Sequence, residues 1–152
     1  MGAYTLFKKY VYKTEKKKHV FLKATKITSL TQVVSRVIDI KSNKVYITTR
    51  VLKHLYDKKP SIEFYDCIKN LPKIIRYPDT IHANIESKRG DYCFIKKYDS
   101  RFYICSLKKA RVAKKDLTEE TLFVVTIFWL RRQTYLKKYP HIWSWRGDIP
   151  SS

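Results

Sequence analysis

The chain has 152 residues, a usual length for one globular domain, and its 44% of hydrophobic residues excludes a wholly disordered protein. Lys and Arg number 33 against 13 Asp and Glu, which gives a formal net charge of +20. Such an excess of positive charge destabilises a compact fold by self-repulsion, which favours a polyanionic partner. The cations are spread along the chain rather than along one helix face, so nucleic acid is a more suitable partner than a membrane surface.

The first 32 residues are predicted to form a β-hairpin extension. Tyr4–Tyr12 and His19–Ala24 alternate roughly between apolar and polar residues, as half-buried strands do. The Lys-rich run Lys16–Lys18 between them is predicted to be a solvated turn. This hairpin is either an arm that grips nucleic acid or plain scaffold.

The next two elements are predicted to be a strand and a helix. Val33–Ile40 is rich in Val and Ile, which favours a strand. Ser42 or Asn43 can then cap a helix over Val45–Tyr56, in which apolar residues recur on one face.

A second helix and a short strand are predicted to follow. Apolar residues at helical spacing begin after Pro60, and this helix is expected to end near Pro72. The segment Lys73–Ile85 mixes Ile with Pro and Asp, which indicates a short strand and a turn.

The last third of the chain is predicted to be β-structure. Tyr92–Tyr98 and Arg101–Leu107 alternate and are joined by Asp99 and Ser100, which predicts a β-hairpin. Leu122–Leu130 is a nearly unbroken apolar, β-branched run, which is typical of a central strand covered on both faces.

This order of elements predicts an α+β fold. We expect one domain over residues 1–152, with two helices packed on one face of an antiparallel β-sheet. Within it, residues 33–145 form the core and residues 1–32 form the N-terminal β-hairpin extension.

The cysteines and the apolar segments bear on the cellular compartment. Cys67, Cys93 and Cys105 are odd in number and have no CxxC spacing, so they predict neither a zinc site nor a disulfide framework. Residues 1–9 lack the apolar run of a signal peptide, and Leu122–Leu130 is too short to cross a bilayer. We therefore expect a cytoplasmic protein with reduced thiols, with no metal, no cofactor and no membrane partner.

His54 is a candidate acid–base group. It lies at the edge of the apolar face of the predicted helix over Val45–Tyr56, and Arg50 and Asp57 fall on the same flank. A histidine there can act as a general acid or base near neutral pH, or it can be a half-buried helix residue without a chemical task.

Cations cluster on and just before the first strand of the predicted hairpin. They are Lys88, Arg89, Lys96 and Lys97. Alternation places Tyr92, Phe94, Lys96 and Tyr98 on one face of that strand. This face can hold an RNA base and its phosphate, or its lysine can simply extend from the core edge into water.

Three further features lie toward the C-terminus. Thr126 interrupts the apolar run, and its hydroxyl must either bond a neighbouring backbone group or point into a site. Arg131 and Arg132 are generic phosphate-binding residues. The alternating residues His141, Trp143 and Trp145 form either a base-stacking platform or a terminal strand that packs over the core.

Three segments, in this order, resemble small barnase-like nucleases of phages and bacteria. They are VYITTRVLKHLYDKKP at Val45–Pro60, RGDYCFIKKY within Ile81–Tyr98, and VVTIF at Val124–Phe128. Such nucleases belong to the barnase–EndoU–colicin–RelE superfamily of metal-independent ribonucleases. The resemblance covers roughly residues 33–145 and implies a toxin or phage-borne effector, with RNA as substrate and an antitoxin or immunity protein as a possible partner.

The resemblance also implies roles for particular residues. His54 would be the general acid or base, Arg89 and Lys96 would stabilise negative charge, and Thr126 would orient the phosphate. RNA-binding contacts would come from Tyr92, Tyr98, Lys88, Lys97, Arg131 and Arg132. The family's second histidine, which precedes a proline, is replaced by Lys59. The alternative is a non-catalytic RNA- or DNA-binding module on the same fold.

Overall fold

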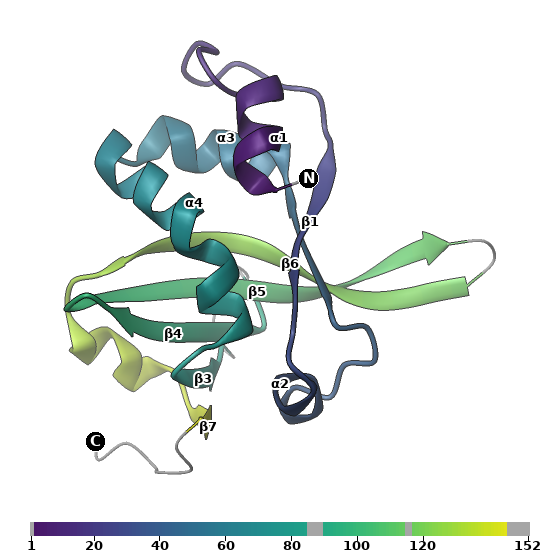
Figure 1. Cartoon of the computed structure of the whole chain (residues 1–152), viewed down its shortest axis with the longest axis vertical. Coiled ribbons are helices and arrows are strands. Elements are labelled where there is room, and N and C mark those ends of the chain that lie inside the picture. Colours follow the sequence, from purple (N-terminus) through teal and green to yellow (C-terminus); the bar gives the residue numbers. More distant parts are fainter. Residues whose placement is uncertain (1, 85–89, 115–116, 146–152) are drawn as a thin grey trace.

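The structure, a computed structural model, describes residues 2–84, 90–114 and 117–145 (Figure 1). The elements in chain order are α1 (Ala3–Tyr10), β1 (Ala24–Ser29), α2 (Gln32–Val37), β2 (Lys44–Thr48), α3 (Thr49–Lys58), α4 (Ser61–Arg76), β3 (Thr80–Ala83), β4 (Tyr92–Tyr98), β5 (Arg101–Lys114), β6 (Leu117–Leu130), the 3-10 helix η1 (Gln133–Lys138) and β7 (His141–Ser144). The strands form one seven-stranded sheet in the order β1-β2-β6-β5-β4-β3-β7. The predicted α+β class is confirmed, and the predicted antiparallel pairing holds except between β2 and β6, the parallel pair among the described strands. The described residues form four α-helices, so the predicted packing of two helices on the sheet is not confirmed.

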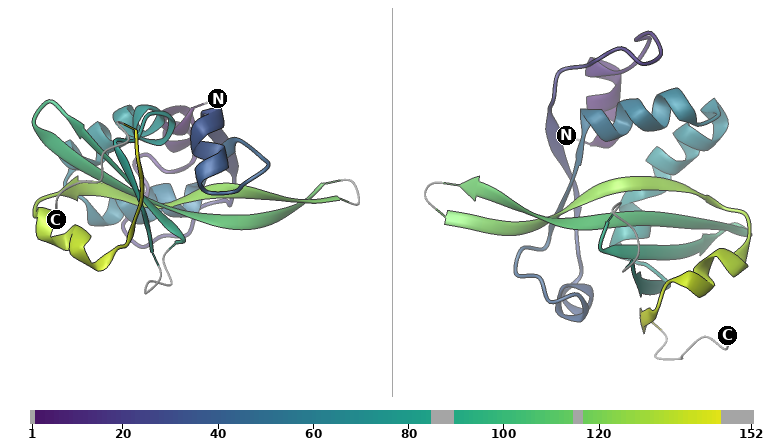
Figure 2. Two further views of the ribbon diagram at one scale, coloured as in Figure 1. Left: turned by 90° about the horizontal axis from the view of Figure 1, so that it is seen from below. Right: turned by 180° about the vertical axis from the view of Figure 1, so that it is seen from behind.

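The main core lies between the α-helices and one face of the sheet. Figure 1 shows α4 in front of β4 and β5, and the reverse view in Figure 2 shows it behind them. Phe7 of α1, Leu52 of α3 and Leu71 of α4 are completely buried in this core. A smaller cluster on the other face includes Ile95 and Ile104 and is packed against η1. None of the described helices is long and apolar enough to cross a membrane.

The apolar run in β6 is an interior strand, as predicted. It pairs with β2 on one side and with β5 on the other. Val124 and Ile127 contribute to the main core, whereas Leu130 belongs to the cluster on the opposite face. Burial on both faces explains why polar residues are rare in this segment.

The hairpin of β4 and β5 is also confirmed. Asp99 and Ser100 have φ angles of 49° and 65°, and left-handed conformations at two adjacent residues are what a tight two-residue hairpin turn requires. β5 extends beyond the predicted end at Leu107 and runs to Lys114, paired with β6 throughout.

The predicted N-terminal β-hairpin is wrong. Its first strand, Tyr4–Tyr12, is instead helix α1. Ala3, Leu6, Phe7 and Val11 are buried, a spacing of three and four residues that fits a helix and not a strand. The Lys16–Lys18 run is solvated as expected, but it connects α1 to β1 rather than two strands.

The predicted strand Val33–Ile40 is largely the short helix α2. Thr31 caps this helix, because its hydroxyl accepts a hydrogen bond from the backbone N–H of Val34 at 3.3 Å. Val34 and Ile38, four residues apart, are buried. The cap and this burial override the strand preference of the β-branched residues.

The predicted helix over Val45–Tyr56 begins four residues too early. Val45 and Ile47 alternate as the buried residues of β2, and only Thr49 onward is helical. Thr48 supplies the cap of α3, since its hydroxyl accepts from the N–H of Val51 at 3.3 Å. The strand therefore leads directly into the helix that carries His54.

Helix α4 does not end near Pro72 but continues to Arg76. A proline inside a helix removes one backbone hydrogen bond and costs about 3 kcal/mol or more. Ile74 and Ile75 lie beyond it and are fully buried against the sheet. Burial of these two side chains offsets the lost hydrogen bond.

Candidate nucleic-acid interface

His54 lies on an exposed stripe of α3. Arg50 and Lys58 are four residues before and after it and are also exposed, whereas Leu52 and Leu55 on the opposite side are buried. The stripe faces the segment that connects α1 to β1. Together they line a groove of 370 Å³, which we call the basic groove. Its lining residues are Lys16, Lys17, Lys18, His19, Val20, Leu22, Arg50, Lys53, His54, Asp57 and Lys58.

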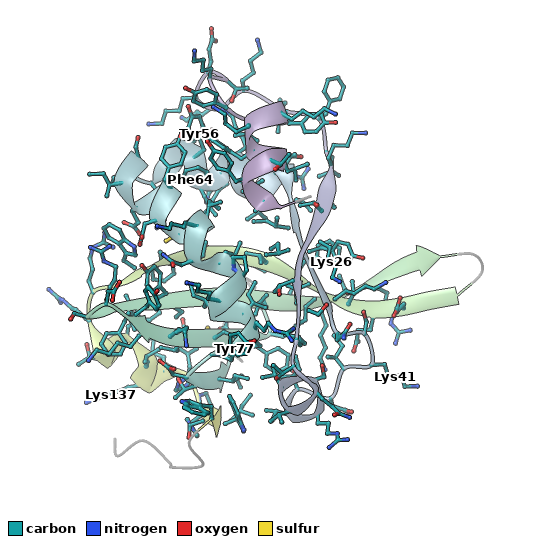
Figure 3. The ribbon with its side chains drawn as sticks, in the orientation of Figure 1. Lys26, Lys41, Tyr56, Phe64, Tyr77 and Lys137 are labelled. Carbon is teal, nitrogen blue, oxygen red and sulfur yellow. The ribbon has the colours of Figure 1, made fainter. Side chains whose placement is uncertain are left out.

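Lys96 lies near the C-terminal end of α4, away from the basic groove that His54 lines. Its ammonium donates a hydrogen bond to the carbonyl oxygen of Tyr77 at 2.7 Å and lies 3.5 Å from the Asp79 carboxylate. Figure 3 shows Tyr77 next to the C-terminal end of α4, far from Tyr56 of α3. His54 and Lys96 line two different hollows that share no lining residue, so the structure does not bring them to one phosphate.

Thr126 is on the other face of the sheet. Its strand neighbour Ile127 points into the main core with the helices, and successive residues of a strand point to opposite faces. Thr126 is paired with Ser106 of β5, whose hydroxyl lies 3.7 Å from the thiol sulfur of Cys93. The structure therefore does not bring His54, Lys96 and Thr126 together, and Lys88 and Arg89 lie outside the described residues.

The remaining predicted RNA contacts are also separated from His54. The half-buried Tyr92 donates its hydroxyl hydrogen to the carbonyl oxygen of Ile38 at 3.2 Å. Tyr98 shares the helix-side face of β4 with Tyr92, as alternation predicted, and accepts from Lys73 at 3.4 Å. Lys97 is exposed, with its ammonium 5.6 Å from the centre of the Phe102 ring.

Of the predicted arginine pair, Arg131 takes part in a structural ion pair. Its guanidinium donates to the carboxylate of Glu63 at 2.6 Å, and Glu63 is 1% exposed. Glu63 also accepts from the backbone N–H of Trp129 at 3.1 Å, so this pair ties α4 to the end of β6. Arg132 is exposed and remains accessible to a ligand.

Two histidines that the sequence did not connect meet across β3 and β7. The ring centres of His82 and His141 are 5.4 Å apart. The ring nitrogens of His82 lie 3.0 Å from the Thr80 hydroxyl and 3.1 Å from the carbonyl oxygen of Tyr139. Burial lowers the pKa of His82, and both of its ring nitrogens have partners within the fold, which is typical of a structural histidine.

The three cysteines are free and buried, as expected. Burial raises the pKa of the Cys67 thiol to about 12, and it also raises the pKa values of Cys93 and Cys105. A thiolate is the nucleophilic form of cysteine, so these residues are packed side chains and not reactive groups.

Asp66 organises a hydrogen-bond network between α4 and the sheet. Its carboxylate accepts from the Tyr103 hydroxyl, from the Trp129 indole N–H at 2.9 Å and from Arg101 at 3.4 Å. Burial alone would raise the pKa of Asp66, but the two hydrogen bonds and the charge of Arg101 hold it below its usual value. Burial of the Tyr103 side chain and its contact with Asp66 raise the pKa of Tyr103 to about 12.

Because the folded-state pKa of Asp66 is lowered, its stabilising effect is present above the ordinary carboxyl pKa and is lost as the pH falls through the folded value. Asp66→Asn is expected to lower the free energy of unfolding by about 2 kcal/mol at neutral pH, since an amide nitrogen cannot accept from these donors. Urea titrations should show this difference shrinking below about pH 4. Asp99→Asn, in the exposed hairpin turn, is the control. A difference that persists unchanged in acid would contradict this role for Asp66.

The basic groove contains many cations and one carboxylate, Asp57, whose charge is balanced by Lys53. Asp57 accepts from the Lys53 ammonium at 2.9 Å and from the backbone N–H of Lys17 at 3.0 Å. Burial alone would raise the pKa of Asp57, but these bonds and the charges of Lys53 and Lys16 hold it below its usual value. In the part of the chain that the structure describes, ion pairs engage Lys53, Lys59, Lys96, Arg101, Lys109 and Arg131, and none of Lys16, Lys17, Lys18, Arg50 and Lys58.

His19 is the residue of this groove that sequence reasoning missed. It is exposed and lines the groove with His54, although 35 positions separate the two in the chain. No local pattern links residues so far apart, and only the folding of α1 and α3 against each other brings their segments together. The groove thus has two histidines and five cations that form no ion pair among the described residues.

Comparison of the chain with protein-family models, with curated proteins and with solved structures found no match. The function must therefore be argued from its own residues.

Proposed function

We propose that this protein binds RNA through the basic groove. The observation that carries the proposal is the charge of the groove, where Lys16, Lys17, Lys18, Arg50 and Lys58 face solvent and the one carboxylate is held by Lys53. Unpaired cations gathered at one surface repel one another, and a polyanion relieves that repulsion. The phosphate backbone of a nucleic acid is such a partner.

Apolar side chains beside the groove favour a single strand. Phe21 and Leu22 are 79% and 67% exposed, three and four residues after Lys18. An exposed aromatic ring next to cations can stack on an unpaired base while the cations contact phosphates. The regular duplex hides its bases from such contacts, so we expect single-stranded RNA to be the preferred ligand.

The salt dependence of binding tests this proposal. Five phosphate contacts on a single strand should give a slope of about −3.5 when the logarithm of the binding constant is plotted against that of the salt concentration. Fluorescence anisotropy with a labelled single-stranded RNA measures this slope. A slope near zero would show that the cations of the groove do not contact phosphates, and the proposal would fail.

Metal-independent RNA cleavage in the same groove is the second candidate function. The observation that favours it is that His19 and His54 line one groove, so two imidazoles are available although Lys59 replaces the second histidine of the barnase-like pattern. One imidazole would remove the proton of the ribose 2′-OH, whose oxygen attacks the adjacent phosphorus. The other would protonate the leaving 5′-oxygen.

The cations of the groove would assist that reaction. The attack places extra negative charge on the phosphate oxygens, and nearby Lys and Arg side chains stabilise it. Arg50 lies one helical turn before His54, in a suitable place for this task. Two further proposals go with RNA cleavage and not with RNA binding alone. One is membership of the barnase–EndoU–colicin–RelE superfamily, and the other is an antitoxin or immunity protein as partner.

A further inference from the structure

A second hollow, of 530 Å³, lies near the C-terminal end of α4, between that helix, α2 and β7. We call it the aromatic hollow. Its lining residues are Thr31, Val33, Val34, Arg76, Tyr77, Pro78, Asp79, Lys96, Trp143 and Trp145. Its volume falls within the usual range of small-ligand sites, about 300 to 1,000 Å³.

The aromatic residues of the hollow are anchored to the fold, and two of their rings are accessible. Tyr77 is 57% exposed and Trp145 is 61% exposed. The backbone N–H of Trp145 donates to the carbonyl oxygen of Asp79 at 3.1 Å, and Trp143 packs against the main core. The hydrogen bond fixes the backbone at Trp145, and its exposed ring offers a stacking partner an accessible aromatic face.

Two cations stand beside these rings. The Arg76 guanidinium lies 5.6 Å from the centre of the Tyr77 ring, and it is oriented by hydrogen bonds to the Tyr77 hydroxyl at 3.1 Å and to the carbonyl oxygen of Ser29 at 2.8 Å. The Lys96 ammonium lies next to the Tyr77 backbone. Asp79 balances one of the two charges, so the hollow keeps a net positive charge.

We infer that the aromatic hollow stacks an unpaired nucleobase of the bound RNA, with Arg76 and Lys96 next to its phosphates. The inference rests on the proposed function and adds a second contact site, which holds one base of the single strand. Aromatic faces attract any base, and cations at their rim attract the backbone that every base carries. Lys96 thus meets a phosphate, as the sequence suggested, but beside Tyr77 and Trp145 instead of Tyr92 and Tyr98.

Trp145→Ala tests the inference. Stacking on an aromatic side chain contributes about 1 to 3 kcal/mol per base, so the affinity for single-stranded RNA should fall about tenfold or more, while the affinity for a duplex of the same sequence stays unchanged. Trp145→Phe keeps a ring and should retain most of the affinity. Tyr4→Ala removes a similarly exposed ring from α1 and is the matched control.

Intrinsic fluorescence gives a second measurement. A base stacked on Trp145 should quench part of the tryptophan emission of the wild type, and Trp145→Phe should lose that part. Suppose that Trp145→Ala binds single-stranded RNA as tightly as the wild type does and with the same salt slope. The aromatic hollow is then not a site for a base, while the basic groove remains the proposed RNA-binding site. If the wild type binds no RNA, the inference fails together with the proposed function.

Discussion

The triple variant Lys16→Gln, Lys17→Gln, Lys18→Gln is expected to bind single-stranded RNA about 100-fold more weakly than the wild type at 0.1 M salt. Each phosphate contact contributes about 0.7 to the salt slope, which makes it worth roughly a factor of five at that concentration, and three contacts multiply. The lysines are exposed and their side chains form no ion pair among the described residues, so the fold should tolerate the change. Fluorescence anisotropy measures the two dissociation constants.

A variant with the same loss of charge elsewhere is the control. Lys41, Lys137 and Lys138 are also exposed, and Figure 3 shows Lys41 and Lys137 at the end of the molecule that lies away from the α1–β1 connection. Their replacement by glutamine should change affinity by only a few-fold. Equal weakening in both variants would mean that RNA responds to net charge alone and that the basic groove is not its site.

His54→Ala is expected to reduce cleavage of single-stranded RNA in EDTA by about 100-fold or more, if the basic groove is a cleavage site. The loss of a general acid or base typically removes a factor of 10² to 10⁴ from the rate, whereas the phosphate contacts that hold the RNA remain. Affinity should therefore change little. His19→Ala should have a similar effect, and the double variant should add little, because the two groups act as a unit.

The controls for this experiment separate catalysis from folding and from contamination. His141→Ala removes a half-buried histidine on β7, outside the groove, and should cleave as the wild type does. If the His54→Ala variant cleaves RNA at the wild-type rate, the groove is not a cleavage site, and RNA binding remains as the proposed function.

The C-terminal half of the sheet could be predicted because its signals are local. Asp99 and Ser100 suit a tight turn, and Leu122–Leu130 is too uniformly apolar for an edge strand. The N-terminal third could not be read from strand-like alternation, because Phe7 and Val11 follow a helical spacing within a segment that also alternates. In α2, the cap at Thr31 was the signal that the richness in Val and Ile concealed.

The candidate site was harder to predict than the fold. Local spacing predicts which residues lie on the same face of one strand or one helix. It does not predict whether residues of different strands, such as Lys96 and Thr126, point to the same face of the folded sheet. The pairing of His19 with His54 needs the tertiary contact between α1 and α3. The net charge, by contrast, depends on composition alone, so a polyanionic partner could be predicted without knowing which residues meet in the fold.

Comparison of two salt slopes tests the central claim most directly. The slope should become less steep by about 2.1 when Lys16, Lys17 and Lys18 are all replaced by glutamine, because three phosphate contacts are lost and each contributes about 0.7. The control variant with glutamine at Lys41, Lys137 and Lys138 should keep the wild-type slope. Identical slopes for the wild type and the groove variant would contradict the claim that the basic groove holds RNA.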